Sequence, residues 1–423
     1  MRTNDTLKKG VTEVVKTVYK RSRKSRVRTE ISDILRLVAK QSRRQVTIRR
    51  HFHKHPELSF EEIQTTAYIL KELRAVGLKI LPVSSRTGVL AELNGALPGP
   101  TLAIRTDIDA LSVAEMTGLR YRSCRDGIMH ACGHDVHMAT VLGAVKVLVE
   151  IRDQLQGKVR FIFQPGEESP PGGAQPMIAD GALKDVSAIL GLHVDPHLAV
   201  GKIGLRDGVT MASVTDFDLI ISGTGGHAAR PQTSVDAIVV AAEVVESIQK
   251  IVSREIDPIA PVAITFGKIA GGTARNVIAD RVVLTGTARA LSKAASRRLP
   301  KLIKRTATGV CKARGARVEM VTMAGYPVLS NDARVNRLLA RNYQTLFGRN
   351  KIAKTEPVLG GEDFACYLQK VPGAMFRLGV RNKNIGADQP WHSSRFIVDE
   401  ESMRFGTALL AATAIDFLSN GFR

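Results

Sequence analysis

Hydrophobic and polar positions along the chain follow two alternating periods. Short apolar runs that resemble buried strands, such as residues 101–107, 159–163 and 188–193, are separated by segments in which apolar residues recur at helical spacing, such as 65–76 and 139–149. Strands that alternate with helices in this way are typical of a largely parallel sheet with helices on its faces. The pattern therefore predicts an α/β domain.

The pattern changes near residue 210. Strand-like runs at 217–222, 262–269, 281–289 and 317–322 frame helix-like segments at 237–252 and 292–313. The order β-α-β-β-α-β predicts a compact α+β domain of ferredoxin-like type. After Tyr326 the earlier pattern returns, with helices expected at 333–346 and 401–418 and a strand at 374–379. We therefore expect an inserted domain at 210–323 within a discontinuous larger domain, 44–209 and 324–423. A chain of 423 residues is long enough for two domains.

Charge sets residues 1–43 apart as a basic N-terminal extension. The net charge is +21, and the first 50 residues hold 16 Lys and Arg against four acids. One interpretation is an arm that contacts nucleic acid or another anionic surface; the other is a basic helical extension without that role. No aromatic residues interleave to support single-strand binding. The longest apolar runs are too short to span a membrane, and four scattered cysteines favour a reducing, cytoplasmic compartment.

Candidate chemistry concentrates in the run Met129-His-Ala-Cys-Gly-His-Asp-Val-His137. Thiolate, imidazole and carboxylate groups are the ligands of zinc-like metals. Cys132 and His134, two residues apart, suit a tight loop that points both side chains inward. Short pairs of this kind also arise by chance, so the run alone indicates a metal site without establishing it.

Further candidate ligands follow the expected strands. Glu167 and Glu168 come after the buried run 159–163, so one carboxylate can bind metal while the other acts as general base. His193 ends another apolar run. Asp107 and Asp109 end a third, where open α/β sheets place ligands, although a turn or helix cap explains these acids equally well. The residues themselves indicate a metal-dependent hydrolase. A pair of metal ions, which in dinuclear sites lie roughly 3.5–4 Å apart, would account for the number of candidate ligands.

A family resemblance rests on longer runs, which occur in order from about residue 46 to the C-terminus. They are Arg49-Arg-His-Phe-His-Lys-His-Pro-Glu-Leu-Ser-Phe60, Arg105-Thr-Asp-Ile-Asp-Ala-Leu111, the run 129–137, Phe163-Gln-Pro-Gly-Glu-Glu168, Gly191-Leu-His-Val194, Gly226-His-Ala-Ala-Arg-Pro231, Asn276-Val-Ile278 and Gly360-Gly-Glu-Asp-Phe-Ala365. Together they resemble the M20 family of metallopeptidases and amidohydrolases. More narrowly, they resemble its aminoacylase, hippurate hydrolase and auxin-conjugate hydrolase branch, whose zinc-peptidase-like catalytic domain carries an inserted lid and dimerisation domain.

The resemblance implies a role for each matching residue. The implied metal ligands are Cys132, His134, Glu168, His193 and His392. Glu167 matches the general acid/base, and His227 matches a lid-domain residue thought to stabilise the oxyanion in a neighbouring subunit. Asn276 and Arg289 are expected to bind substrate, and Asp107 and Asp135 to support the ligands. The implied cofactor is a pair of divalent ions, zinc or manganese, with cobalt and nickel as further candidates.

The expected activity is hydrolysis of the amide bond of an N-acyl amino acid (acetyl, benzoyl or similar) by a homodimer. A dipeptidase or carboxypeptidase that uses the same site is the alternative within this fold. The alternative from another class is a binding protein that works through its basic arm. Gly166 stands where the family usually has Ala, and Ala279 where it has Pro. Every expected metal and base position is filled, so an active enzyme is expected.

Overall fold

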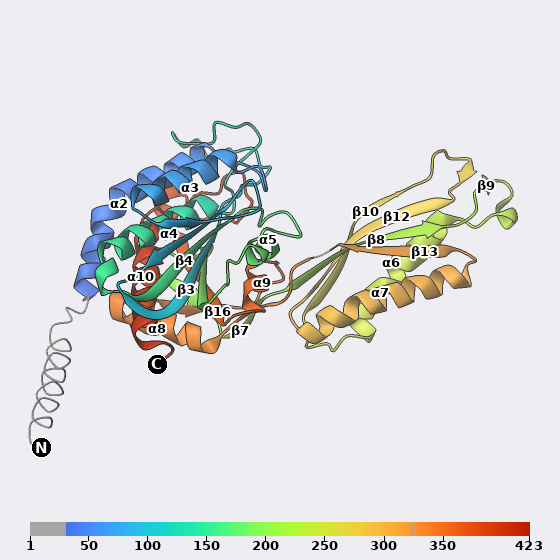
Figure 1. The fold of residues 1–423 in the computed structure, drawn as a ribbon. Helices are drawn as coiled ribbons and strands as arrows, with labels where there is room; N and C mark the ends of the chain where they lie inside the picture. The colour runs from blue at the N-terminus through green and yellow to red at the C-terminus, as the bar shows by residue number, and fades with distance from the viewer. Residues whose placement is uncertain (1–30, 324) are drawn as a thin grey trace, which may run out of the picture.

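The computed structural model describes residues 31–323 and 325–423 and shows a larger and a smaller domain (Figure 1). The larger domain contains both the described N-terminal helix and the C-terminus, and the smaller one extends away from it. The predicted fold class is confirmed: a mostly parallel sheet covered by helices, with a small antiparallel domain. No helix in the described ranges is long and apolar enough to cross a membrane.

Eight strands form the sheet of the larger domain, in the order β1-β2-β4-β3-β5-β16-β6-β15. Their bounds are β1 Lys79–Leu81, β2 Val89–Asn94, β3 Leu97–Asp107, β4 Gln156–Gln164, β5 Val186–Ala199, β6 Ile203–Leu205, β15 Ile352–Lys354 and β16 Gly373–Arg381. The central strands β4, β3, β5 and β16 run parallel. Their carboxyl ends therefore meet at one edge of the sheet, where ligands bind in open α/β folds.

Helices cover both faces of this sheet. One core contains the apolar faces of α2 Ile31–Lys54, α3 Ile63–Ala75, α4 His134–Glu150, α8 Ala333–Phe347 and α10 Ser402–Asn420. The other contains the short helices α5 Ala174–Ala179 and α9 Phe364–Leu368. Single 3-10 turns occur at Arg152–Gln154, Pro231–Thr233, Arg349–Lys351 and Lys383–Ile385. Helices α4 and α10 are buried along almost their whole length, as their continuous apolar sequences require.

The expected boundary at residue 43 lies inside α2. Ile34, Leu37 and Val38 are buried in the core of the larger domain, so this helix packs against α4 and α10 from its first turns. Their helical spacing is visible in the sequence. The high density of basic residues in 1–43 led to the prediction of a separate extension, although the start of α2 falls within this range. The expectations for residues 1–30 lie outside the described part of the chain.

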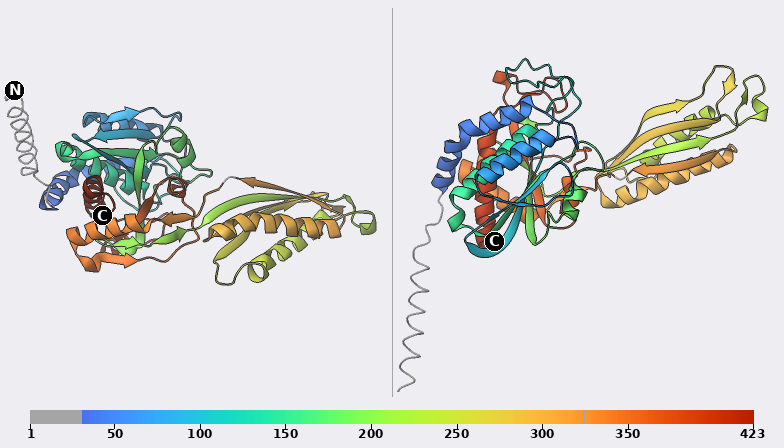
Figure 2. Two further views of the ribbon diagram at one scale, coloured as in Figure 1. Left: turned by 60° about the horizontal axis from the view of Figure 1, so that its bottom comes forward. Right: turned by 45° about the horizontal axis from the view of Figure 1, so that its top comes forward.

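The smaller domain contains β8 Ser213–Ser222, β9 Gly226–His227, α6 Ala237–Arg254, β10 Val262–Gly271, β11 Val277–Ile278, β12 Arg281–Ala290, α7 Lys293–Ala313 and β13 Arg317–Met323. Its four-stranded sheet has the order β10-β12-β8-β13 with every pairing antiparallel. The side chains of Asp236 and Ser292 cap α6 and α7, since each accepts backbone N–H bonds of the first turn. Helices α6 and α7 lie on one face of this sheet (Figure 2). Strands β7 Gly208–Met211 and β14 Leu329–Asn331 pair where the chain passes between the domains.

Candidate active site

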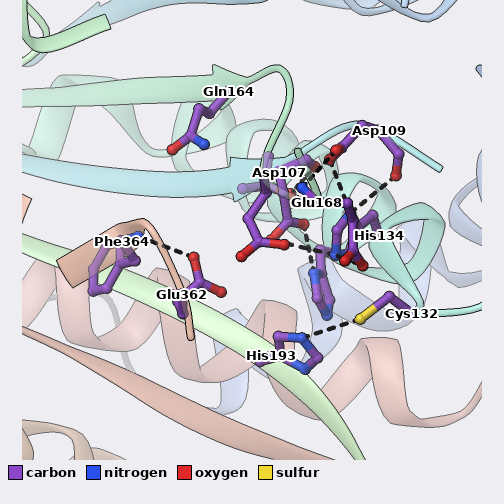
Figure 3. A network of polar contacts seen from close by, with 12 residues as sticks. Asp107, Asp109, Cys132, His134, Gln164, Glu168, His193, Glu362 and Phe364 are labelled. Carbon is purple, nitrogen blue, oxygen red and sulfur yellow. Dashed lines mark hydrogen bonds and ion pairs between the residues drawn. The ribbon is translucent and has the colours of Figure 1, made fainter. Parts of the chain in front are cut away.

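The candidate site lies at the edge where the parallel strands end (Figure 3). Strand β3 ends at Asp107, the loop after β4 carries Glu167 and Glu168, and His193 lies in β5. Two loops complete the arrangement, one before α4 and one after β16. The predicted ligands come together because this topology gathers the strand ends from distant parts of the sequence.

Gly133 makes the turn that presents two of the predicted ligands. Its φ is 86°, and a Cβ atom here would lie 2.5 Å from Cγ2 of Val194, so another residue would be strained and would displace the Val194 side chain. Cys132 precedes this turn, and His134 is the first residue of α4. The Sγ atom of Cys132 lies 3.5 Å from Nε2 of His193. The turn therefore directs both side chains toward β5.

Hydrogen bonds orient the two buried imidazoles. Nδ1 of His134 donates to the backbone oxygen of Asp109 at 2.9 Å and lies 3.2 Å from its carboxylate. Nδ1 of His193 donates to the backbone oxygen of Val194 at 2.8 Å. Because a backbone oxygen takes Nδ1 of each ring, Nε2 is the nitrogen that the neutral ring can offer to a metal. Metal-binding histidines are held in this way.

His392 approaches from the late loop. Its backbone N–H donates to the oxygen of Ala131 at 2.9 Å, which joins this loop to the turn before α4. Its φ of 63° is left-handed, a conformation that costs energy for a residue with a side chain. This backbone conformation places Nε2 of His392 3.6 Å from Oε1 of Glu168. The chain thus accepts local strain where the fifth predicted ligand meets the others.

The donor atoms fit a divalent metal centre. Two groups of three, Cys132 with His134 and His193, and Cys132 with Glu168 and His392, each lie within 4.8 Å of one another and share the thiol. Within the described chain, Nε2 of His134 and Oε1 of Glu168 are buried without a hydrogen-bond partner. Burial, followed by the charges of Glu168 and Glu167, raises the pKa of the Cys132 thiol well above its usual range. A thiolate here requires a nearby cation, and this thiolate, imidazole and carboxylate set suits borderline metals.

Glu167 is buried beside these donors. Burial, and then the charges of Glu362, Glu168 and Asp363, raise its pKa well above the usual range for a carboxyl group. Burial likewise raises the pKa of Glu168 to about 7. The hydroxyl of Tyr326 donates to the backbone oxygen of Glu167 at 2.6 Å and holds the loop. A carboxyl group that holds its proton this strongly is suited to general acid/base work.

An ionic cluster around Arg105 was not anticipated from the sequence. Its guanidinium is fully buried and pairs with Asp107 at 2.8 Å, Glu362 at 3.1 Å and Asp363 at 2.8 Å. Gln164 also accepts from Arg105 and donates to Asp363. Two of its acids, Glu362 and Asp363, belong to the run 360–365 that carries the family resemblance. The cluster lies next to Glu167, because carboxylate oxygens of Glu167, Glu362 and Asp363 lie within 4.8 Å of one another.

The acids near the ligands have different partners. Asp109 contacts Nδ1 of His134, whereas Asp107 lies 3.8 Å from Nε2 of the same ring and accepts from Nδ1 of His137 at 2.6 Å. Asp135 was expected to support the ligands, but the structure places it elsewhere. Its carboxylate lies 2.8 Å from both Arg49 and His53 of α2, and it therefore ties α4 to that helix.

A cavity of ≈ 560 Å³ opens beside the predicted ligands and is lined in part by Glu167, Arg289, Tyr326, Arg377 and Trp391. Arg289 enters from the smaller domain, and its Nη1 donates to the backbone oxygen of Leu359 at 3.2 Å. The structure thus brings this predicted substrate-binding residue to the predicted metal ligands.

His227 and Asn276 lie elsewhere. They line a second hollow where β9 pairs with β11, at the end of the smaller domain away from the larger one (Figure 1). Within one chain they are therefore separate from the predicted metal ligands and from Glu167.

Comparison with known proteins agrees with this arrangement. The model of peptidase family M20/M25/M40 matches residues 103–416. The chain belongs to the M20 family. It is 39% identical to the N-acetylcysteine deacetylase of Bacillus subtilis over 88% of this chain and 96% of that protein. It is 37% identical to thermostable carboxypeptidase 1 of Saccharolobus solfataricus over 88% and 95%. The crystal structure of a Bacillus subtilis protein described as a dinuclear metal-binding peptidase of the M20 family superposes with a TM-score of 0.78, at 35% identity, covering 89% of this chain and 98% of that one.

These likenesses confirm the predicted family and the predicted class of enzyme. This M20 protein is a hydrolase that acts on amide bonds.

Proposed function

We propose that this M20 hydrolase removes the acyl group from N-acyl amino acids, with two divalent ions held by Cys132, His134, Glu168, His193 and His392. The observation that carries the proposal is the convergence of these five donors beside a buried carboxyl group, Glu167, at a cavity of ≈ 560 Å³. When bound, such ions would acidify water and polarise the substrate carbonyl. A dinuclear relative and a deacetylase relative support the choice.

Glu167 carries the proton in this proposal. Its carboxylate accepts a proton from the attacking water, whose oxygen forms the new C–O bond. The same carboxyl group then gives that proton to the nitrogen as the amide C–N bond breaks, so one carboxylate and one amine leave. Burial and the bond from Tyr326 keep Glu167 at the edge of the cavity. Arg289, on the same cavity, would bind the α-carboxylate of the amino acid.

Carboxypeptidase activity is the second candidate, because relatives with that name cover most of the chain. A metal-replete screen separates the two. It compares N-acetyl, N-benzoyl and longer N-acyl amino acids with dipeptides and with peptides that have free amino termini. We expect N-acyl amino acids to be the better substrates. A higher kcat/KM for peptides would establish the second candidate.

His227 and Asn276 would serve the site of a second copy in a homodimer. Their place at the far end of the smaller domain separates them from their own metal ligands, which supports this arrangement. Mixing two inactive variants, Glu167→Gln and His227→Ala, tests it. After subunit exchange, the site on the His227→Ala chain receives an intact His227, so activity should return to roughly a quarter of wild type for statistical dimers. Two variants that stay inactive when mixed would contradict the shared site.

The basic arm remains a separate expectation. If residues 1–43 bind nucleic acid or another polyanion, binding must weaken steeply with salt and disappear when the charges of this segment are removed. Its removal should then leave hydrolysis unchanged at saturating substrate, provided that the packed residues of α2 are retained.

A further inference from the structure

Arg377 places a second arginine on the active-site cavity. It lies in β16, directly beside His193 of the neighbouring parallel strand β5. Its guanidinium carbon is 5.8 Å from the ring centre of Trp391, and its Nη2 is 3.0 Å from Sδ of Met211. Strand β16 thus carries a fixed positive charge to the same edge of the sheet as the metal ligands.

This guanidinium lacks a carboxylate partner within residues 31–323 and 325–423. Among the described residues, no acidic oxygen lies within the 4.0 Å of an ion pair from Arg377, whereas Arg105 in the same sheet pairs with three carboxylates. Asp195 is the acid whose charge acts most strongly on Arg377, but its Oδ1 already accepts the backbone N–H of His197 at 2.8 Å. The thioether of Met211 is a weak acceptor. Burying a cation without a paired anion costs free energy, so the surroundings of Arg377 favour the binding of an anionic ligand group.

The cavity continues past Arg377. Val358, Arg377 and Trp391 line both the active-site cavity and an adjoining one of ≈ 350 Å³. The adjoining cavity is lined further by Arg206 and Lys354, along with the acids Asp195 and Glu356. Arg377 therefore stands on the wall between the two. A substrate group that extends beyond the space next to Glu167 would meet it there.

We propose that Arg377 binds a second carboxylate of the substrate, so that the preferred substrates are dianionic N-acyl amino acids. The inference rests on the proposed function and names its substrate class. Arg289 and Arg377 approach the cavity from different domains, so each can bind one carboxylate. The second carboxylate is either the side chain of an acidic amino acid or the far end of a dicarboxylic acyl group.

Two matched substrate pairs distinguish these sources. N-acetylglutamate against N-acetylglutamine tests the side chain, and N-succinylalanine against N-butanoylalanine tests the acyl group. In the wild type, kcat/KM for one dianion should exceed that of its partner by about 10- to 100-fold, the range for a charge-assisted hydrogen bond to a desolvated carboxylate. Arg377→Gln should remove this ratio, mainly through KM, and Arg377→Lys should restore part of it.

A binding measurement removes dependence on turnover. Calorimetry on the Glu167→Gln protein, with and without Arg377→Gln, should show the same ratio in Kd. Arg381→Gln is the control, since Arg381 ends the same strand but lies outside the lining of both cavities; it should preserve the wild-type ratio.

Two results would overturn the inference in distinguishable ways. If N-acyl amino acids are hydrolysed but both wild-type ratios are near one, or Arg377→Gln leaves a high ratio in place, Arg377 does not select dianions and the proposed function stands. If the metal-replete enzyme hydrolyses no N-acyl amino acid of either charge, the proposed function fails and the inference fails with it.

Discussion

Asp109 offers the sharpest test of how the metal site is held. Its backbone oxygen and carboxylate both lie within reach of Nδ1 of His134, at 2.9 and 3.2 Å. The other carboxylate oxygen accepts from the hydroxyl of Ser59 at 2.7 Å and from the backbone N–H of Glu168 at 2.9 Å. One side chain therefore orients one predicted ligand and positions the backbone of another.

Asp109→Asn keeps the shape but converts one oxygen to an NH₂ group. If the amide oxygen faces Ser59 and Glu168, the NH₂ group faces the N–H of His134, so two donors oppose each other. If the amide is flipped, the NH₂ group opposes the backbone N–H of Glu168 instead. The backbone oxygen of Asp109 still selects the correct tautomer, so ligation weakens without being lost. Replacing such a group costs about 10- to 100-fold in metal affinity, or roughly 1.4–2.7 kcal/mol.

The assay is competition for zinc or manganese against a chelator of known affinity, with melting of the metal-free protein as a check on folding. Asp135→Asn is the matched control, because Asp135 is also buried and acidic but faces Arg49 and His53. It should lower the stability of the fold, since it breaks a buried ion pair, and leave metal affinity in the folded protein unchanged. Asp109→Asn with wild-type affinity, or an equal loss in Asp135→Asn, would refute the assignment.

Three further outcomes are expected. Glu167→Gln should lower kcat by about 10²- to 10⁴-fold with metal content, measured by elemental analysis, near wild type; an active variant would refute its role. Leu37→Ala should destabilise the fold by about 2–4 kcal/mol in urea unfolding, because Leu37 is buried in the core; no loss would mean that the start of α2 is not packed. Burial alone would raise the pKa of Glu115, but its hydrogen bond to His53 and further bonds lower it from 4.5 to about 2. Its stabilising effect is therefore present above pH 4.5 and lost as the pH falls toward 2, so Glu115→Gln should be less stable than wild type near neutrality and approach it near pH 2, as followed by unfolding at several pH values.

Long periodic segments were predictable from the sequence, and short ones were not. Helix α6 was expected at 237–252 and spans Ala237–Arg254, because its apolar stripe and its Asp236 cap are local signals. Strands β6 and β15 have three residues each, too few to show a period. Helix α4 begins at His134, whereas its apolar pattern begins at Ala139, because the first turn carries the polar residues His134, Asp135 and His137. The polar residues of the first turn therefore hid the start of α4 from a prediction based on apolar spacing.

The candidate ligands were predicted from motifs, but the residues that contact and orient them were not. Arg105 and Asp363 are 258 positions apart and meet only because β3 and the loop before α9 lie at the same edge of the sheet. No local pattern connects them. Nor does the sequence show that both acids meet the ring of His134, with Asp109 near Nδ1 and Asp107 near Nε2.

The ionic cluster of Arg105, Asp107, Glu362 and Asp363 influences both Glu167 and the candidate metal donors. Burial, and then the charges of Glu362, Glu168 and Asp363, keep the pKa of Glu167 high. These charges also favour cations at the five donors. Positive charge bound there would act on Glu167 in the opposite sense to Glu362 and Asp363 and lower its pKa toward the working range. The same acids therefore raise the pKa of Glu167 and favour a cation at the candidate donors, so the proposed metal site and the base strength of Glu167 depend on the same charges.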